Sequence, residues 1–183
     1  ALYMSMALDK NYIDKTDFDV LQPAIDYYEN HGSATDKLRT FYYQGRVFYN
    51  RGEIEDAMEC MIKSIDLGKT SSDLLTKARN YTVQGTLYYL YYNWDKIIEC
   101  SLAACDCYKT IGDIANYVIM LCRVAEVNTL MGNKELGRDY LLRCQDLLDG
   151  INNNSKAYYY RVCLSNDSYE LPSETIPQNI VEY

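Results

Sequence analysis

Histidine and proline are scarce in this chain, and each scarcity limits what the protein can be. One histidine, His31, occurs among 183 residues, which removes most catalytic and metal chemistries that need several imidazoles. His31 stands before Gly32, where we expect a helix to end and where a histidine commonly binds main-chain carbonyls. A catalytic role for it is therefore disfavoured. Three prolines leave long segments free to form helices.

Positive charge is also in deficit. The chain has 18 Lys and Arg against 26 Asp and Glu, a formal net charge of −8. A nucleic-acid backbone or an anionic membrane surface would repel such a chain. No apolar run approaches the roughly 20 residues that span a bilayer. We therefore expect no nucleic-acid partner for this chain and no direct membrane insertion.

The seven cysteines lack the pattern of a disulfide framework or a metal site. Their number is odd and no Cys-x-x-Cys occurs. On the helix expected around them, Cys105 and Cys107 would project about 200° apart and could not share one zinc ion. We interpret the cysteines as apolar core residues. No glycine-rich phosphate-binding string is present either, so we predict no catalytic residue, no metal, no cofactor and no enzyme.

What the chain does contain is a small residue that recurs every 40 positions. The five marks are Ser5, Gly45, Gly85, Ala125 and Ser165. Identical residues flank the second and third marks at matching positions, for example Cys60 and Cys100. A fixed period of this length indicates stacked supersecondary units. The small side chains are expected where helices approach closely.

Each unit is predicted to contain two helices. Apolar residues from Leu38 to Tyr49 and from Ile54 to Ile65 follow the i, i+3, i+4, i+7 spacing of a helix face. No segment alternates as a half-buried strand does, so no strand is predicted. The expected helices cover residues 1–10, 19–31, 34–51, 53–67, 72–92, 94–111, 114–131, 133–149 and 154–165.

Residues at the expected helix ends support these bounds. Ser33 and Asp36 have the spacing of a capping box. The glycines expected to stop helices are Gly68, Gly112 and Gly150. Residues 11–18 make the first turn too long for a regular repeat, and the last repeat lacks its second helix. We therefore predict a helical repeat domain over residues 1–165 and an extended C-terminal tail over residues 166–183.

Five residues of the second unit carry a family resemblance: Gly45, Phe48, Gly52, Ala57 and Met61. They resemble the tetratricopeptide repeat (TPR), whose consensus has a small residue, an aromatic residue, glycine, alanine and a large side chain in these places. Later copies depart from it, with Ile97 in place of the alanine and Asn128 in place of the aromatic residue. The resemblance implies an all-α fold, a right-handed α-solenoid of about 4.5 stacked antiparallel helix pairs.

The same resemblance implies a concave face that binds a protein segment or peptide. The residues in the corresponding places are Arg39, Tyr42, Arg46, Tyr49, Arg79, Thr82, Thr86, Tyr89 and Glu126, with Ile119, Cys122 and Thr129 beside Glu126. Arginines among tyrosines would bind carboxylates and pack against a peptide. The alternative is that these arginines pair with the chain's own acids, such as Asp36 or Glu53. Both interpretations stay open at this stage.

The segments Leu8–Asp14 and Tyr27–Gly32 resemble the repeat region of large bacterial transcriptional regulators. This implies a fragment of a larger membrane-anchored protein, with the repeats facing the periplasm. Seven thiols without a disulfide framework favour a reducing cytoplasm instead; of the two, we favour the periplasm. The predicted function is a non-catalytic protein- or peptide-binding scaffold, the sensing or interaction region of such a regulator. The alternative is a structural module whose end, residues 154–183, docks onto a second copy as a homodimer.

Overall fold

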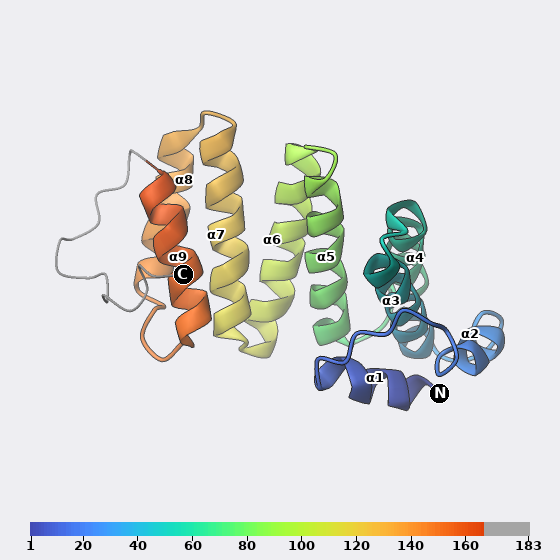
Figure 1. Cartoon of the computed structure of the whole chain (residues 1–183). Coiled ribbons are helices and arrows are strands. Elements are labelled where there is room, and N and C mark those ends of the chain that lie inside the picture. The colour runs from blue at the N-terminus through green and yellow to red at the C-terminus, as the bar shows by residue number, and fades with distance from the viewer. Residues whose placement is uncertain (167–183) are drawn as a thin grey trace. The chain divides into compact units, whose positions relative to one another are not determined.

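The chain is all-helical over residues 1–166, the part that the computed structural model describes (Figure 1). No strand occurs among these residues, which confirms the all-α prediction. The predicted tail, apart from Asn166, lies outside the described residues. The helices are α1 (Leu2–Lys10), α2 (Gln22–Tyr28), α3 (Ala34–Arg51), α4 (Ile54–Leu67), α5 (Leu74–Tyr89), α6 (Trp94–Ile111), α7 (Ile114–Leu130), α8 (Lys134–Gln145) and α9 (Asn153–Ser165).

Every predicted helix has a counterpart, and the bounds are best where the end signals are strongest. Helix α3 begins after Ser33, whose hydroxyl accepts from the Asp36 N–H at 3.2 Å, while the Asp36 carboxylate accepts from the Ser33 N–H at 2.9 Å. This is the predicted capping box. Gly112 ends α6 with a φ of +77°, as expected of a C-terminal glycine. Gly68 ends α4 as expected too.

The expectation that Gly150 ends a helix is wrong. Helix α8 already stops at Gln145, and the chain continues in turns in which the Leu147 N–H donates to the Cys144 carbonyl at 2.9 Å. Gly150, with a φ of +85°, lies in the connection to α9 instead. The apolar pattern continues through Leu147 and Leu148, so periodicity alone extended the helix past its real end.

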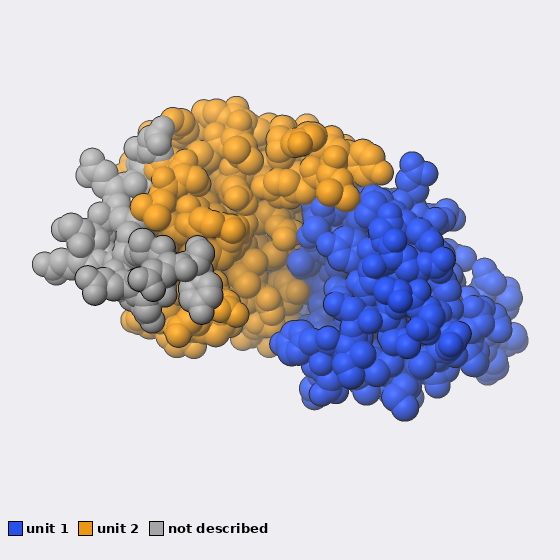
Figure 2. Space-filling view, in the orientation of Figure 1, with its two compact units in different colours: residues 1–87 blue, residues 88–183 orange. Residues whose placement is uncertain are grey.

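The chain divides into two compact units, residues 1–87 and residues 88–183 (Figure 2). In the first unit, α3 packs along α4, and α1 and α2 pack on α3. Helices α3 and α4 approach closely at Gly45, where a Cβ atom would lie 2.8 Å from Met61 Cε and 3.2 Å from the Ala57 carbonyl oxygen. The second mark, Gly45, therefore lies where α3 and α4 are close together. Core members of this unit include Leu21, Tyr43, Met61, Val83 and Leu87.

Helix α5 is tied to α4 by buried amides. The fully buried Asn80 donates from Nδ2 to the Met61 carbonyl at 3.1 Å, and it accepts from Gln84 Nε2 at 2.8 Å. These groups are shielded from water and depend on one another for hydrogen bonds. Their pairing defines how α5 sits on α4 within the first unit.

In the second unit, α7 is the central helix and packs against α6, α8 and α9. Val118, Leu121 and Val124 of α7 are almost completely buried. The α7–α8 crossing lies at Ala125 and Gly137, where a Cβ atom on Gly137 would lie 2.9 Å from the Ala125 carbonyl oxygen. The fourth mark is thus also at a close crossing, whereas the fifth, Ser165, is the last residue of α9.

Candidate binding face

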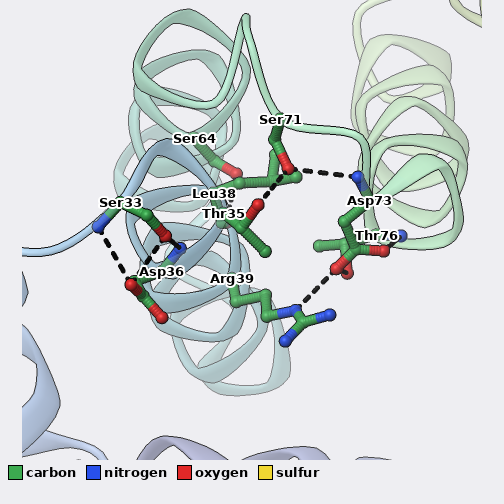
Figure 3. A network of polar contacts seen from close by, with 9 residues as sticks. All are labelled: Ser33, Thr35, Asp36, Leu38, Arg39, Ser64, Ser71, Asp73 and Thr76. Carbon is green, nitrogen blue, oxygen red and sulfur yellow. Dashed lines mark hydrogen bonds and ion pairs between the residues drawn. The ribbon is translucent and has the colours of Figure 1, made fainter.

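Arg39 of α3 makes a close ion pair with Asp73, the residue before α5. Its Nε lies 2.6 Å from Asp73 Oδ2 (Figure 3). Asp73 also accepts from the N–H and the hydroxyl of Thr76 at 3.1 and 2.8 Å. Burial by itself would raise the pKa of Asp73, but the hydrogen bonds from Thr76 and Arg39 outweigh it and hold that pKa below its ordinary value. Asp73 therefore binds Arg39 as a carboxylate.

Arg46 and Arg79 meet carboxylates from the N-terminal part of the chain. Arg46 Nη2 lies 3.0 Å from Asp14 Oδ1 and 3.8 Å from Asp9 Oδ1. Arg79 Nη1 lies 3.2 Å from Asp9 Oδ2. Asp9, at the end of α1, thus bridges arginines from α3 and α5. Burial opposes the charge of Arg46, but Tyr42, Asp9 and Asp14 outweigh it and raise its pKa.

Of the two interpretations of the arginines, the structure shows the pairing with the chain's own acids, with partners other than those we expected. Asp36 is used in the cap of α3, and Glu53 pairs with Arg51 at 2.8 Å. We call Arg39, Arg46 and Arg79, with their carboxylate partners, the arginine face of the first unit. Each of the three arginine side chains keeps between 26% and 37% of its surface exposed.

The segment Ile13–Thr16 lies beside this face and forms no regular structure. The side-chain amide of Asn50 donates to the Lys15 carbonyl at 3.0 Å, next to the Asp14–Arg46 ion pair. A pocket of about 30 Å³ remains between this segment, α1 and α3. Nε of Arg46, which helps to line the pocket, is buried and has no hydrogen-bond partner within residues 1–166.

The two tyrosines predicted on α3 are placed differently from the arginines. Tyr42 is 2% exposed and belongs to the core of the first unit, where its ring lies edge-on to that of Tyr43 at 4.9 Å. Burial raises the pKa of Tyr42. Tyr49 is half-buried and packs against the same core. Thus Tyr42 contributes packing to the face, not a contact surface.

The threonines predicted on α5 bond within their own helix. The hydroxyl of Thr82 donates to the Ala78 carbonyl at 2.9 Å, and that of Thr86 donates to the Thr82 carbonyl at 3.0 Å. Both side chains are half-buried. Such back-bonding satisfies the hydroxyl group locally.

In the second unit, Tyr89 and Glu126 are brought together. The Tyr89 hydroxyl donates to Glu126 Oε2 at 3.2 Å, and the hydroxyl of Tyr158 donates to the same oxygen at 2.7 Å. Burial and then the charge of Glu126 raise the pKa of Tyr89 to about 12, so this phenol remains a hydrogen-bond donor at neutral pH. Of the neighbours predicted beside Glu126, Cys122 is fully buried and Ile119 is half-buried. The hydroxyl of Thr129 donates to the Ala125 carbonyl at 2.9 Å.

A contact between equivalent repeat positions occurs once within each of the two compact units. Tyr89 bonds to Glu126, 37 positions later, and Asp9 faces Arg46 across the same separation at 3.8 Å. Because the marks recur every 40 residues, both pairs join equivalent positions of successive 40-residue repeats. Each compact unit therefore contains one contact between these two repeat positions, and of the four residues only Asp9 lies outside the predicted face. Asp9, Asp14 and Tyr158 were missed because the sequence prediction of the face covered only the three middle 40-residue repeats.

None of the seven cysteines, all within residues 1–166, forms a disulfide bond, and six of them are buried. Burial raises the pKa values of Cys60, Cys105 and Cys163 to about 12. Among residues 1–166, no group of three or more His, Cys, Asp or Glu side chains is arranged to hold a metal ion. In that same part of the chain, no helix has the length and apolar character needed to cross a membrane. His31, the single imidazole, has Nδ1 2.9 Å from the Tyr27 carbonyl at the end of α2.

No protein-family model matches this chain, and no curated protein matches its sequence. The tetratricopeptide resemblance stays a prediction.

Proposed function

We propose that the chain is a non-catalytic scaffold that binds a protein segment or peptide at the arginine face of its first unit. The observation that carries this proposal is the set of three partly exposed arginines on two helices, each held by a carboxylate. A guanidinium group has five N–H donors in a fork that fits carboxylates, more than these contacts use. A partner with acidic side chains could add to these contacts or replace them.

Peptide binding to the full chain tests this proposal. Fluorescein-labelled peptides of acidic, neutral and basic composition would be titrated while anisotropy and melting temperature are followed. We expect acidic peptides to bind, to raise the melting temperature and to bind less tightly as salt rises. Arg46→Gln should weaken binding. Arg51→Gln is the matched control, because Arg51 lies on the same helix but pairs with Glu53.

The proposal is wrong if no composition class binds, or if acidic peptides bind equally well to the Arg46→Gln variant. The resemblance to regulator repeats supports placing this scaffold in the sensing or interaction region of a larger bacterial protein, with the repeats in the periplasm. The sequences that flank these 183 residues in the full gene test that placement.

A second candidate function, self-association, is favoured by exposed leucines at the end of the second unit. Leu136 and Leu142 of α8 and Leu164 of α9 are 46%, 42% and 66% exposed. Repeat arrays need a polar cap or a neighbour over such an end. Sedimentation velocity at low and high concentration tests this function. A concentration-dependent dimer that Leu164→Asp abolishes would support it, and a monomer at both concentrations would contradict it.

A further inference from the structure

The segment Ile13–Thr16 is held on α3 in the way that a bound peptide would be held. It forms no helix or strand, and at its start the Ile13 N–H donates to the Leu8 carbonyl of α1 at 3.0 Å. Arg46 binds its carboxylate, Asp14, at 3.0 Å, and Asn50 binds its main chain at the Lys15 carbonyl, also at 3.0 Å. In the recognition of extended peptides, main-chain hydrogen bonds contribute affinity and side-chain contacts contribute specificity, and this segment makes one contact of each kind.

The segment could leave this face without unfolding the helices on either side. Leu2 in α1 and Leu21 before α2 are 5% and 2% exposed, and both belong to the core of the first unit. Between these anchors, Tyr12 is 95% exposed. Its φ of +57° lies in the left-handed region, which is uncommon for tyrosine.

The contacts that hold the segment are also weak enough to be exchanged. Asp14 is 64% exposed in its ion pair with Arg46, and ion pairs with such exposure contribute little to stability. The tethered segment nevertheless has the advantage of a high effective concentration over any free peptide. The high effective concentration of the segment, more than the strength of its contacts, is therefore the main barrier to a competing partner.

We propose that residues Ile13–Thr16 occupy, within the same chain, the site of an acidic partner segment. The proposal rests on the proposed function and specifies its ligand: an extended stretch of a partner protein with Asp or Glu on Arg46 and the next main-chain carbonyl on Asn50. The N-terminal segment would then compete with the partner and lower its apparent affinity.

The test uses the full chain and a fluorescein-labelled synthetic peptide with the sequence of residues 9–17. In the loop variant, Ile13→Gly, Asp14→Ser and Lys15→Gly are combined so that the tethered segment loses its ion pair with Arg46 and becomes more flexible. We expect the loop variant to bind the peptide about tenfold more tightly than the unaltered chain. Asp14→Asn alone should shift the affinity in the same direction by less.

Further variants test whether the peptide occupies the predicted place. Adding Arg46→Gln to the loop variant should remove the gain, whereas adding Arg51→Gln should leave it intact. A peptide with asparagine at the position of Asp14 should bind the loop variant more weakly. Circular dichroism of each variant checks that the helices are retained, and the single Asp14→Asn variant keeps the test informative if the triple variant unfolds.

Equal affinity of the loop variant and the unaltered chain for the peptide would overturn the inference. If acidic peptides still bind the unaltered chain through Arg46, the proposed function survives that result. If no acidic peptide binds any variant, both proposals fail. A dimer of the unaltered chain that the loop variant loses would also overturn it, because the segment would then occupy the face of a second copy.

Discussion

Replacing Gly137 with alanine tests whether helix spacing in the second unit depends on the absence of a side chain. The added Cβ would lie 2.6 Å from Thr129 Oγ1 and 2.9 Å from the Ala125 carbonyl oxygen. The first contact involves a side chain held by a hydrogen bond to Ala125, and the second involves backbone. Helices α7 and α8 must therefore move apart, and such overpacking costs about 1–3 kcal/mol.

Alanine also favours the helix over glycine by about 1 kcal/mol, which offsets part of that cost. The expected net loss of stability for Gly137→Ala is about 1 kcal/mol, which lowers the melting temperature by about 2–4 °C in a chain of this size. Thermal unfolding followed by far-ultraviolet circular dichroism measures it.

Gly45→Ala is the matched control on α3. Its Cβ would lie 2.8 Å from Met61 Cε, the mobile end of a flexible side chain, while the Ala57 carbonyl oxygen and Cys60 Cβ are each 3.2 Å away. The overpacking cost should therefore be near the lower end of its range, about 1 kcal/mol, and should be cancelled by the higher helix propensity of alanine. We expect the free energy of unfolding to change by about zero. A melting temperature of Gly137→Ala equal to or above that of Gly45→Ala would refute this account of the crossings.

Three further predictions concern single side chains and pH. Asp73→Asn should destabilise the chain by about 1–2 kcal/mol in urea unfolding, because it removes the charge that holds Arg39. Because folding lowers the pKa of Asp73, this stabilisation is present above the pKa of Asp73 in the unfolded chain and is lost as the pH falls through its pKa in the folded chain. Asp73→Asn should therefore make the free energy of unfolding depend less on pH in the acid range. An unchanged dependence would contradict this role of Asp73. Ser33→Ala should cost about 1 kcal/mol by removing the cap of α3, and a change near zero would show that the capping box contributes nothing. Burial raises the pKa values of Cys60 and Cys105 from 9.0 to about 12. The stability that these two protonated thiols contribute is therefore complete below pH 9 and is lost as the pH rises from 9 towards 12. Cys60→Ala should make the free energy of unfolding fall less steeply with pH in that range, and an equal slope in both proteins would count against burial as the cause.

Local sequence signals account for most of the helices. Helix α3 has the predicted bounds at both ends, because Ser33 and Asp36 cap one end and Gly52 at the other has a φ of +79°, which glycine tolerates. These signals act over a few residues and need no knowledge of the fold. Where the end of α8 had no such signal, the apolar pattern extended the prediction too far.

The candidate site was predictable in part. The resemblance to the tetratricopeptide repeat selected Arg39, Arg46 and Arg79 as face residues, and in the structure all three make ion pairs in the first unit. The acids that we expected beside them, Asp36 and Glu53, were chosen because they are near in sequence. Both have local partners instead, a helix cap and Arg51.

Sequence alone determined where the helices lie, because helix period, caps and turn residues are local properties of the chain. It did not determine the partners of the arginines, which lie 34, 32 and 70 positions away along the chain. Only tertiary structure brings Asp73, Asp14 and Asp9 to the face. The tertiary contacts of α1, α3 and α5 decide which charges meet. They therefore also decide which ion pairs a ligand would have to replace.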